Sequence, residues 1–148
     1  ALNTTWNPNA DLTSKTSTSI RKIAFYSTDV YLYYQVNATA TYFITAYNST
    51  SGALTTDIYS DNLLNDFDIM NGKMYLVGNF TYVDKYNGVG SLQGSANCLN
   101  AVYINLTSNA VTAFTATFTS YSNTVCSYND TLFYNINVRP IISFRNKN

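Results

Sequence analysis

The chain has 148 residues, of which 46% are hydrophobic and 16% aromatic, so it is long enough for one domain with a buried core and too apolar for disorder. Eight basic residues balance eight acidic ones, which argues against nucleic acid or an anionic membrane surface as a partner. No apolar run approaches the roughly 20 residues of a membrane span, so we expect none.

Strand-forming residues dominate the composition, with fourteen Tyr and eight Phe beside many Thr, Val and Ile, which predicts an all-β protein. We interpret residues 1–148 as one region built from repeats. Residues 1–9 match the tail of a preceding unit. The first unit, 20–62, is predicted to contain a hairpin over 24–36 and a second hairpin over 42–54, each formed by an apolar run on either side of a turn.

The second unit, 63–121, repeats this order, with a hairpin over 68–80 and another over 99–111. Between them lies a Gly- and Ser-rich stretch, 82–96, which we predict to be a long loop inserted into the repeat. A partial third unit, 122–148, contains one more hairpin. The chain therefore holds about two complete and two partial units.

One turn recurs in the alignment of the first two units, where Asn48 falls opposite Asn105 and Gly52 opposite Asn109. Gly and Asn are the residues that best tolerate a positive φ. The two hairpins are therefore predicted to make the same tight turn.

The repeat resembles a known family at MYLVGNFTYV (74–83), at LNAVYINLTSNAVTAF (99–114) and at WNPN (6–9). These segments resemble delta-60-type β-propeller repeats, and the second unit keeps the glycine of that pattern as Gly78. The resemblance implies propeller-like blades of short antiparallel strands. Because propellers use 4 to 8 blades, the ring would be open or completed by other chains. A β-sandwich is the alternative fold.

Six Asn-X-Ser/Thr sequons, in which X is not Pro, predict N-linked glycans on an extracellular or cell-surface protein, at Asn3, Asn37, Asn48, Asn79, Asn105 and Asn129. Their number is close to what this Asn-, Ser- and Thr-rich composition yields by chance. Their placement in predicted turns is the stronger signal, because a bulky glycan there points into water. In an oxidising lumen, Cys98 and Cys126 are expected to form a disulfide, the alternative being two buried thiols.

An acidic cluster between the first two units supplies candidate oxygen ligands for calcium, at Asp57, Asp61, Asp66 and Asp68. It lacks the spacing and the closing Glu of an EF-hand, and the competing interpretation is a turn in which Asp side chains bind the backbone. We expect no cofactor other than glycans.

Tyrosines crowd the first unit, and Tyr31, Tyr33 and Tyr34 are candidates for a binding face that contacts protein or sugar. Strand alternation puts Tyr31 and Tyr33 on one face and Tyr34 on the other. The competing interpretation is packing between blades.

Catalysis is not expected, because the chain has no His and no Glu, and no nucleophile lies beside a recognisable base. Two functions are predicted instead. The first is a secreted, glycosylated structural protein that self-associates or binds other chains in a filament or surface coat. The alternative is a carbohydrate- or protein-binding ectodomain.

Overall fold

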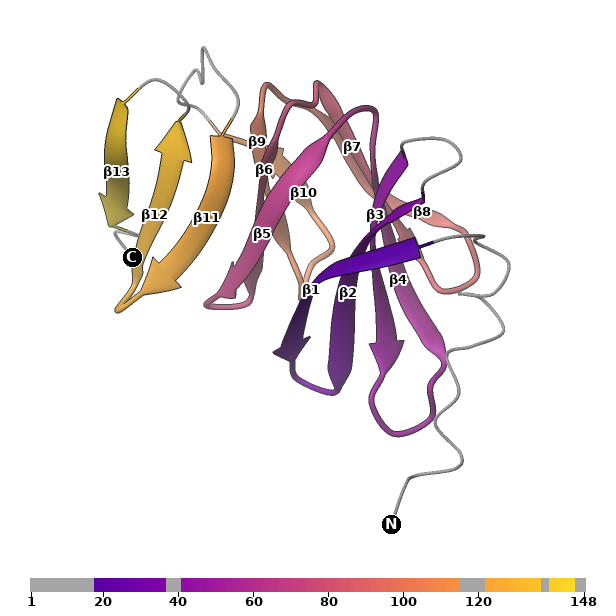
Figure 1. Ribbon diagram of the computed structural model, residues 1–148. Helices are drawn as coiled ribbons and strands as arrows, with labels where there is room; N and C mark the ends of the chain where they lie inside the picture. The colour runs from indigo at the N-terminus through magenta and orange to yellow at the C-terminus, as the bar shows by residue number, and fades with distance from the viewer. Residues whose placement is uncertain (1–17, 37–40, 115–121, 137–138, 146–148) are drawn as a thin grey trace.

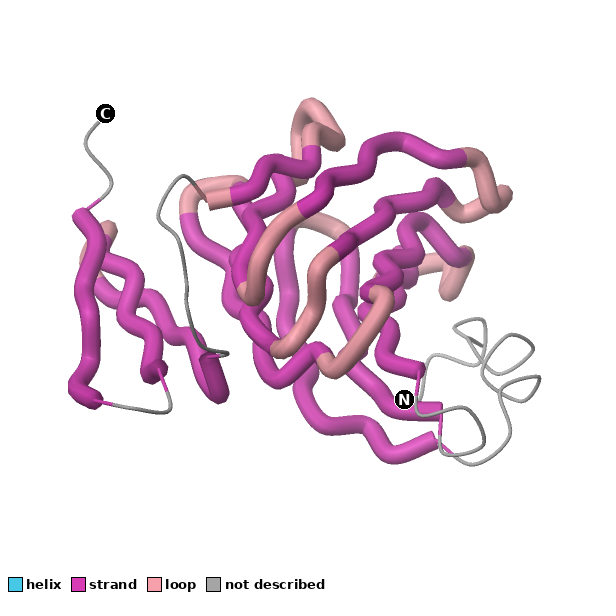
Figure 2. The backbone as a smooth tube through the Cα atoms, turned by 90° about the horizontal axis from the view of Figure 1, so that it is seen from above, coloured by secondary structure: helices cyan, strands magenta, loops and turns pink. Residues whose placement is uncertain are grey.

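The computed structural model describes residues 18–36, 41–114, 122–136 and 139–145, and within these ranges every regular element is a β-strand (Figures 1 and 2). The strands form three antiparallel sheets that do not close into a barrel or a ring. The predicted all-β class is confirmed. Because the described ranges contain no helix, they offer no helical segment suited to crossing a membrane.

The first sheet has six strands, in the order β1 (Thr18–Tyr26), β2 (Asp29–Val36), β3 (Thr41–Asn48), β4 (Leu54–Ser60), β7 (Tyr82–Asn87) and β8 (Leu92–Asn97). The second sheet has four, in the order β10 (Val111–Ala113), β9 (Ala101–Asn105), β6 (Lys73–Gly78) and β5 (Leu64–Met70). The third sheet has three, in the order β11 (Ser122–Tyr128), β12 (Thr131–Ile136) and β13 (Arg139–Arg145).

All five predicted hairpins are confirmed, as β1–β2, β3–β4, β5–β6, β9–β10 and β11–β12. The turn chemistry explains two of them directly. Asn71 and Gly72 both have positive φ between β5 and β6, as do Asn129 and Asp130 between β11 and β12. Two-residue hairpin turns with this backbone match the right-handed twist of the flanking strands.

The predicted loop at 82–96 is wrong. This stretch is the hairpin β7–β8, and it pairs with β4 to widen the first sheet. The Gly and Ser residues of this stretch lie in the turn and in β8. Along β7 the side chains alternate between the two faces of the sheet, with Tyr82 and Tyr86 on one face and the buried Val83 on the other. A period of two indicates a strand even when the next segment is rich in glycine.

The β7–β8 hairpin also connects the first and second sheets. The Lys85 amine on β7 donates to Asn109 Oδ1 at 2.8 Å, and Asn109 Nδ2 donates to Gln93 Oε1 at 3.0 Å. Burial lowers the pKa of Lys85, and the negative charge of Asp29 opposes that shift. Gly94 permits the approach, because a Cβ there would lie 2.6 Å from the carbonyl oxygen of Asn109.

Successive sheets pack face against face. We call the face of a sheet toward the next sheet its front and the opposite face its rear. The front of the first sheet meets the rear of the second in one apolar core, which includes Tyr31, Tyr33, Phe67, Met74 and Leu76. The front of the second sheet meets the rear of the third in another, which includes Tyr75, Val77, Val125, Leu132 and Tyr134.

The first strands of the three sheets, β1, β5 and β11, lie next to one another and share one carboxylate. Asp66 Oδ1 accepts a hydrogen bond from the Lys22 amine of β1 at 3.0 Å. Asp66 Oδ2 accepts from the Thr124 hydroxyl at 2.8 Å and from the Val125 amide at 3.0 Å. Two residues further along β5, Asp68 accepts from the Ser127 amide. Side-chain carboxylates thus satisfy the outward-facing amides of β11, as a neighbouring strand would.

Alkaline pH should destabilise the fold through its buried tyrosines. Burial, followed by the nearby Asp29 charge, raises the pKa of Tyr31 to about 12, and burial does the same for Tyr134. Since tyrosine in the unfolded chain titrates near 10, this contribution is complete below about pH 10 and is lost as the pH rises toward 12. Urea midpoints measured from pH 9 to 12 should fall across that window.

The Tyr31→Phe variant should make this decline shallower, because it removes one of the buried groups that titrate in this window. Tyr128→Phe is the matched control, since Tyr128 is 71% exposed and should leave the profile unchanged. A urea midpoint that is level from pH 10 to 12 would contradict the account.

Candidate functional site

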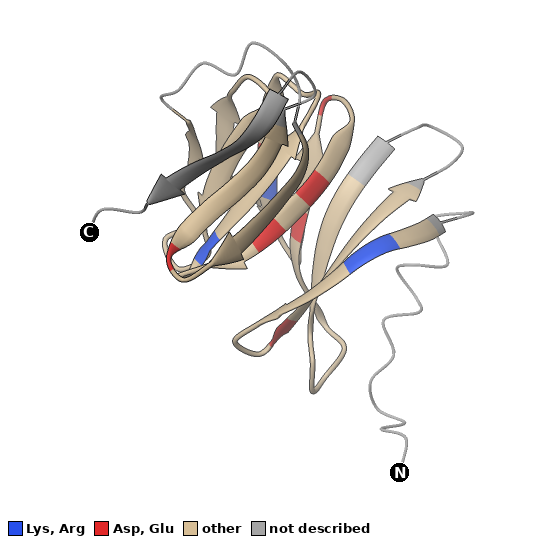
Figure 3. Cartoon of the chain, turned by 60° about the vertical axis from the view of Figure 1, so that its left-hand side comes forward, with Lys and Arg blue, Asp and Glu red and all other residues tan. Residues whose placement is uncertain are grey.

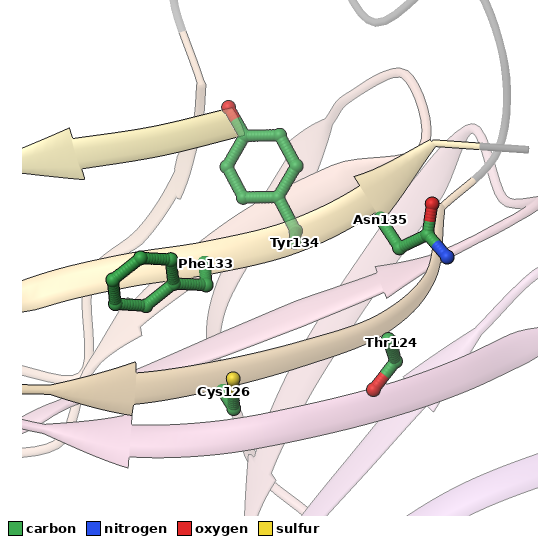
Figure 4. Close-up of a pocket in the computed structure, with 5 residues that line it drawn as sticks. All are labelled: Thr124, Cys126, Phe133, Tyr134 and Asn135. Atoms are coloured by element: carbon green, nitrogen blue, oxygen red, sulfur yellow. The ribbon is translucent and has the colours of Figure 1, made fainter. Parts of the chain in front are cut away.

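The front of the third sheet is open, and it is the first candidate site. Thr124 and Cys126 of β11 pair with Asn135 and Phe133 of β12, and Cys126 and Phe133 lie on the face opposite Val125, Leu132 and Tyr134, which pack on the second sheet. Together with Tyr134 they line an apolar hollow of about 160 Å³, in which Cys126 and Phe133 lie on neighbouring strands (Figure 4). Asn135, Thr124 and Cys126 are exposed, and Phe133 is half-buried.

Phe133 occupies a position that the other units bury. In the repeat, it corresponds to Tyr31 of β2 and Tyr75 of β6, which lie on the fronts of the first and second sheets at 4% and 6% exposure. All the residues from Val30 to Tyr34 of β2 are buried, whereas from Thr131 to Asn135 of β12 only Leu132 and Tyr134 are buried, and both lie on its rear. The third sheet therefore carries a packing face with no neighbouring sheet among the described residues.

The opposite end of the stack shows the complementary feature on β1. Ile20, Ile23 and Phe25 lie on the rear of the first sheet at 52%, 53% and 74% exposure. In the repeat, Ile23 corresponds to Phe67 and Val125, which are 0% and 1% exposed because a preceding sheet covers them. Charged residues are few, and Figure 3 shows them spread over separate strands and turns.

The predicted tyrosine binding face is wrong. Tyr31, Tyr33 and Tyr34 are 4%, 3% and 0% exposed, so none of them offers a contact surface. The predicted alternation does hold: Tyr31 and Tyr33 enter the core against the second sheet, and Tyr34 packs on the rear of the first. The Tyr33 hydroxyl donates to the carbonyl oxygen of Leu64, across the junction of the two sheets.

The predicted identity of the Asn48 and Asn105 turns is confirmed in atomic detail. Asn48 Oδ1 accepts from the amides of Thr50 and Ser51 at 3.0 and 2.9 Å. Asn105 Oδ1 accepts from the amides of residues 107 and 108, both at 2.9 Å. Gly52 and Asn109 then take positive φ values of 71° and 64°.

The described sequons lie at the surface. Asn79 and Asn129 are exposed, and Asn48 and Asn105 are half-exposed. The other two predicted sites, Asn3 and Asn37, lie outside the described residues. All four are therefore accessible from solvent.

The four calcium candidates are not brought together. Asp57 accepts from the Thr45 hydroxyl at 2.6 Å, and Asp66 and Asp68 bind β11 as described above. Asp61 accepts from the amides of Thr81 and Tyr82, and although burial alone would raise its pKa, these hydrogen bonds lower it. In the described ranges, no three acidic or Cys side chains are grouped as metal ligands would be.

The predicted Cys98–Cys126 disulfide is absent, because the two cysteines face different environments. Cys98 is 8% exposed in the core between the first and second sheets, and Cys126 is exposed on the front of the third. Both thiols are free.

Sequence analysis missed a second candidate site on the rear of the first sheet. Asp84 of β7 is 8% exposed and lies on the same face as Tyr82 and Tyr86, because the three alternate along the strand. Asp84 Oδ2 accepts from the Tyr86 hydroxyl at 2.9 Å. The Tyr-X-Asp-X-Tyr pattern of residues 82–86 places these three side chains on one face of a strand. It could not be interpreted in this way while 82–96 was predicted to be a loop.

Comparison with known proteins places the chain in no family, since no family model matches it. No curated protein matches it either. Among solved structures, it is similar to the computationally designed Ika4 protein, at 9% identity and a TM-score of 0.48, with 86% of this chain and 91% of that chain covered. A similarity of this size carries no argument about family or function.

The two thiols should differ sharply in reactivity. Burial, followed by the Asp61 charge, raises the pKa of Cys98 to about 12, so this thiol is protonated as well as shielded. In the native protein, a chromogenic disulfide reagent should modify Cys126 rapidly and Cys98 only after denaturant is added. Failure to titrate any thiol in denaturant would restore the disulfide and contradict the structure.

The repeated turn should depend on the acceptor oxygen of its first residue. Asn105→Ala removes two hydrogen bonds from an exposed turn and should lower the free energy of unfolding by about 1 kcal/mol. Asn105→Asp keeps the acceptor and should cost little, which chemical denaturation will measure. Equal losses for the two variants would show that the side-chain oxygen does not stabilise the turn.

Proposed function

We propose that this protein is a secreted, non-enzymatic assembly protein whose sheets act as propeller-like blades in a stack that further copies of the chain extend. The observation that carries the proposal is Phe133, a front-face aromatic of β12 that no sheet among the described residues covers. Its counterparts Tyr31 and Tyr75 are both buried by a following sheet.

The partner that best fits the open front is the rear of a first sheet from another copy. At both junctions between described sheets, the front of one sheet packs against the rear of the next. The rear of the first sheet exposes Ile23 and Phe25, and the front of the third exposes Cys126 beside Phe133. The two ends are therefore complementary in the same sense as the internal junctions, and the side chains named at both contact surfaces are uncharged.

Such a contact joins two different surfaces, so it repeats from copy to copy. It produces a closed ring if the rotation returns to the start and a filament if it does not. Two copies, with three sheets each, would fall within the 4 to 8 blades of known propellers. A filament or surface coat is the open form of the same contact.

Glycosylation supports an extracellular setting for this assembly. Four sequons lie on described turns and loops with at least partial exposure, and two of them recur at the same turn of the repeat. None of them lies on the open front of the third sheet, so glycans would leave that face accessible. Catalysis has no support in the residue types, since the chain has neither His nor Glu.

Association should be abolished from either end of the stack. Phe25→Ser and Phe133→Ser each remove an aromatic ring from one proposed contact surface. Because Phe25 is 74% exposed, the first change should leave the fold intact, as circular dichroism can verify. Sedimentation velocity from micromolar to millimolar protein should show assembly for the wild type and monomers for both variants.

The matched control is Val89→Ser, which removes an 87% exposed apolar side chain from the β7–β8 turn. It should assemble like the wild type. A wild-type protein that stays monomeric at millimolar concentration would sink the assembly proposal.

Glycan occupancy needs a separate measurement on protein from a secreting eukaryotic host. Intact mass should fall after enzymatic deglycosylation. Thr107→Ala should lower the starting mass by one glycan, because it destroys the Asn105 sequon while keeping the Asn105 side chain that holds the turn. An unchanged mass would remove the secreted-glycoprotein part of the proposal and leave assembly standing.

Ligand binding by an ectodomain is the second candidate function. The specific observation in its favour is the carboxylate of Asp84 among tyrosines on the rear of the first sheet.

A further inference from the structure

The rear of the first sheet carries a row of aromatic side chains that ends at Asp84. Tyr34 stacks on Phe43 with ring centroids 5.9 Å apart, and Phe43 lies 5.8 Å from Tyr59. Strand pairing then places Tyr59 directly opposite Asp84. Tyr82 and Tyr86 flank Asp84 along β7, so three tyrosines frame one carboxylate.

This carboxylate is incompletely satisfied. Its Oδ2 accepts from the Tyr86 hydroxyl, but Asp84 Oδ1 is buried and has no hydrogen-bond partner. Among the described residues it has no ion pair, since the adjacent Lys85 extends to the other face of the sheet and binds Asn109. A buried carboxylate without a compensating charge is destabilising, so the site favours a ligand that brings a positive charge.

Two features of the frame favour an organic cation over a neutral sugar. Tyrosine rings attract cations through their negative faces, and a carboxylate at the centre of the frame adds a full opposite charge. A neutral sugar could donate a hydrogen bond to Asp84 Oδ1 but would leave its charge uncompensated.

We propose that Asp84, framed by Tyr59, Tyr82 and Tyr86, binds an alkylammonium group, supplied by a small organic cation or by a lysine side chain. The three tyrosines are half-exposed, so rotation of one ring opens the path to the buried oxygen. Such rotamer changes are fast and inexpensive for partly exposed side chains. The site shares the rear of the first sheet with Ile23 and Phe25, but it lies on β4 and β7 rather than on β1 and uses none of the residues named in the assembly contact.

The tyrosines also report on the site. Asp84 is the largest cause that raises the pKa of both Tyr82 and Tyr86, and the Tyr86 hydroxyl donates to its Oδ2 at 2.9 Å. An ammonium bound to Asp84 would neutralise that charge and return both pKa values toward that of ordinary tyrosine.

The test is a titration of the ¹⁵N-labelled full chain, followed by amide chemical shifts, with n-butylammonium chloride and, at equal ionic strength, potassium chloride. We expect saturable shifts around Tyr59 and residues 82–87 with butylammonium alone. Asp84→Asn should weaken binding about tenfold or more, since it removes the charge at nearly constant shape. Asp130→Asn is the matched control, because it removes the same charge from an exposed turn of the third sheet and should bind like the wild type.

Two further measurements distinguish a lysine side chain from a small cation as the source of the ammonium group, and allow for an Asp84→Asn variant that does not fold. Tighter binding of a capped Gly-Lys-Gly peptide than of tetramethylammonium would identify a lysine side chain, and the reverse a small quaternary cation. Tyr86→Phe keeps the carboxylate and the ring, so it should still bind butylammonium even if Asp84→Asn fails to fold. Equal shifts with neutral n-butanol, saturation by methyl glycosides but not by butylammonium, or wild-type affinity in Asp84→Asn would each overturn the proposal.

Discussion

The fold rests on one constraint, which is that the second strand of each of the first two sheets is apolar on both faces. From Val30 to Tyr34 and from Met74 to Val77, side chains on opposite faces of the strand are all buried. In the second sheet, the first sheet covers one face of this strand and the third sheet covers the other, so the chain folds as a stack. Asp66 of the second sheet links all three sheets of this stack, because its carboxylate binds Lys22 on β1 of the first sheet and the Val125 amide on β11 of the third. At the two ends of the stack, Phe25 and Phe133 lie on faces that no further sheet of the described chain covers.

The β7–β8 hairpin gives the first sheet a second role. It extends that sheet beyond β4 and joins it to the second sheet through Lys85 and Asn109. Because side chains alternate along β7, a residue that binds the second sheet on the front face requires a neighbour on the rear. That neighbour is Asp84. One strand thus holds the stack together with its odd-numbered residues and presents the tyrosine-framed carboxylate with its even-numbered ones.

Much of the architecture could be predicted from the sequence, because repeats and turns are local signals. The hairpins followed from apolar runs around Asn-Gly and Asn-Asp, and the equivalence of the Asn48 and Asn105 turns followed from the alignment. Burial and pairing between distant segments could not be derived in this way. Tyr34 could equally be exposed as far as its residue type goes, and it is buried because other aromatic side chains pack on it. Cys98 lies in the core between the first two sheets, whereas Cys126 lies on the third. The sequence also could not tell why Gly78 is a glycine: a Cβ there would lie 2.2 Å from the Leu63 carbonyl oxygen.

Hydrogen exchange at two amides of β11 tests the stack most directly. Val125 and Ser127 point their amides away from β12, and in an isolated third sheet they would exchange as freely as any open edge. In the stack they donate to Asp66 and Asp68 of the second sheet. The account predicts that both amides are protected to the same degree as the β11–β12 hydrogen bonds and lose that protection in Asp66→Ala and Asp68→Ala, respectively. Free exchange at both amides in the wild-type protein would contradict it.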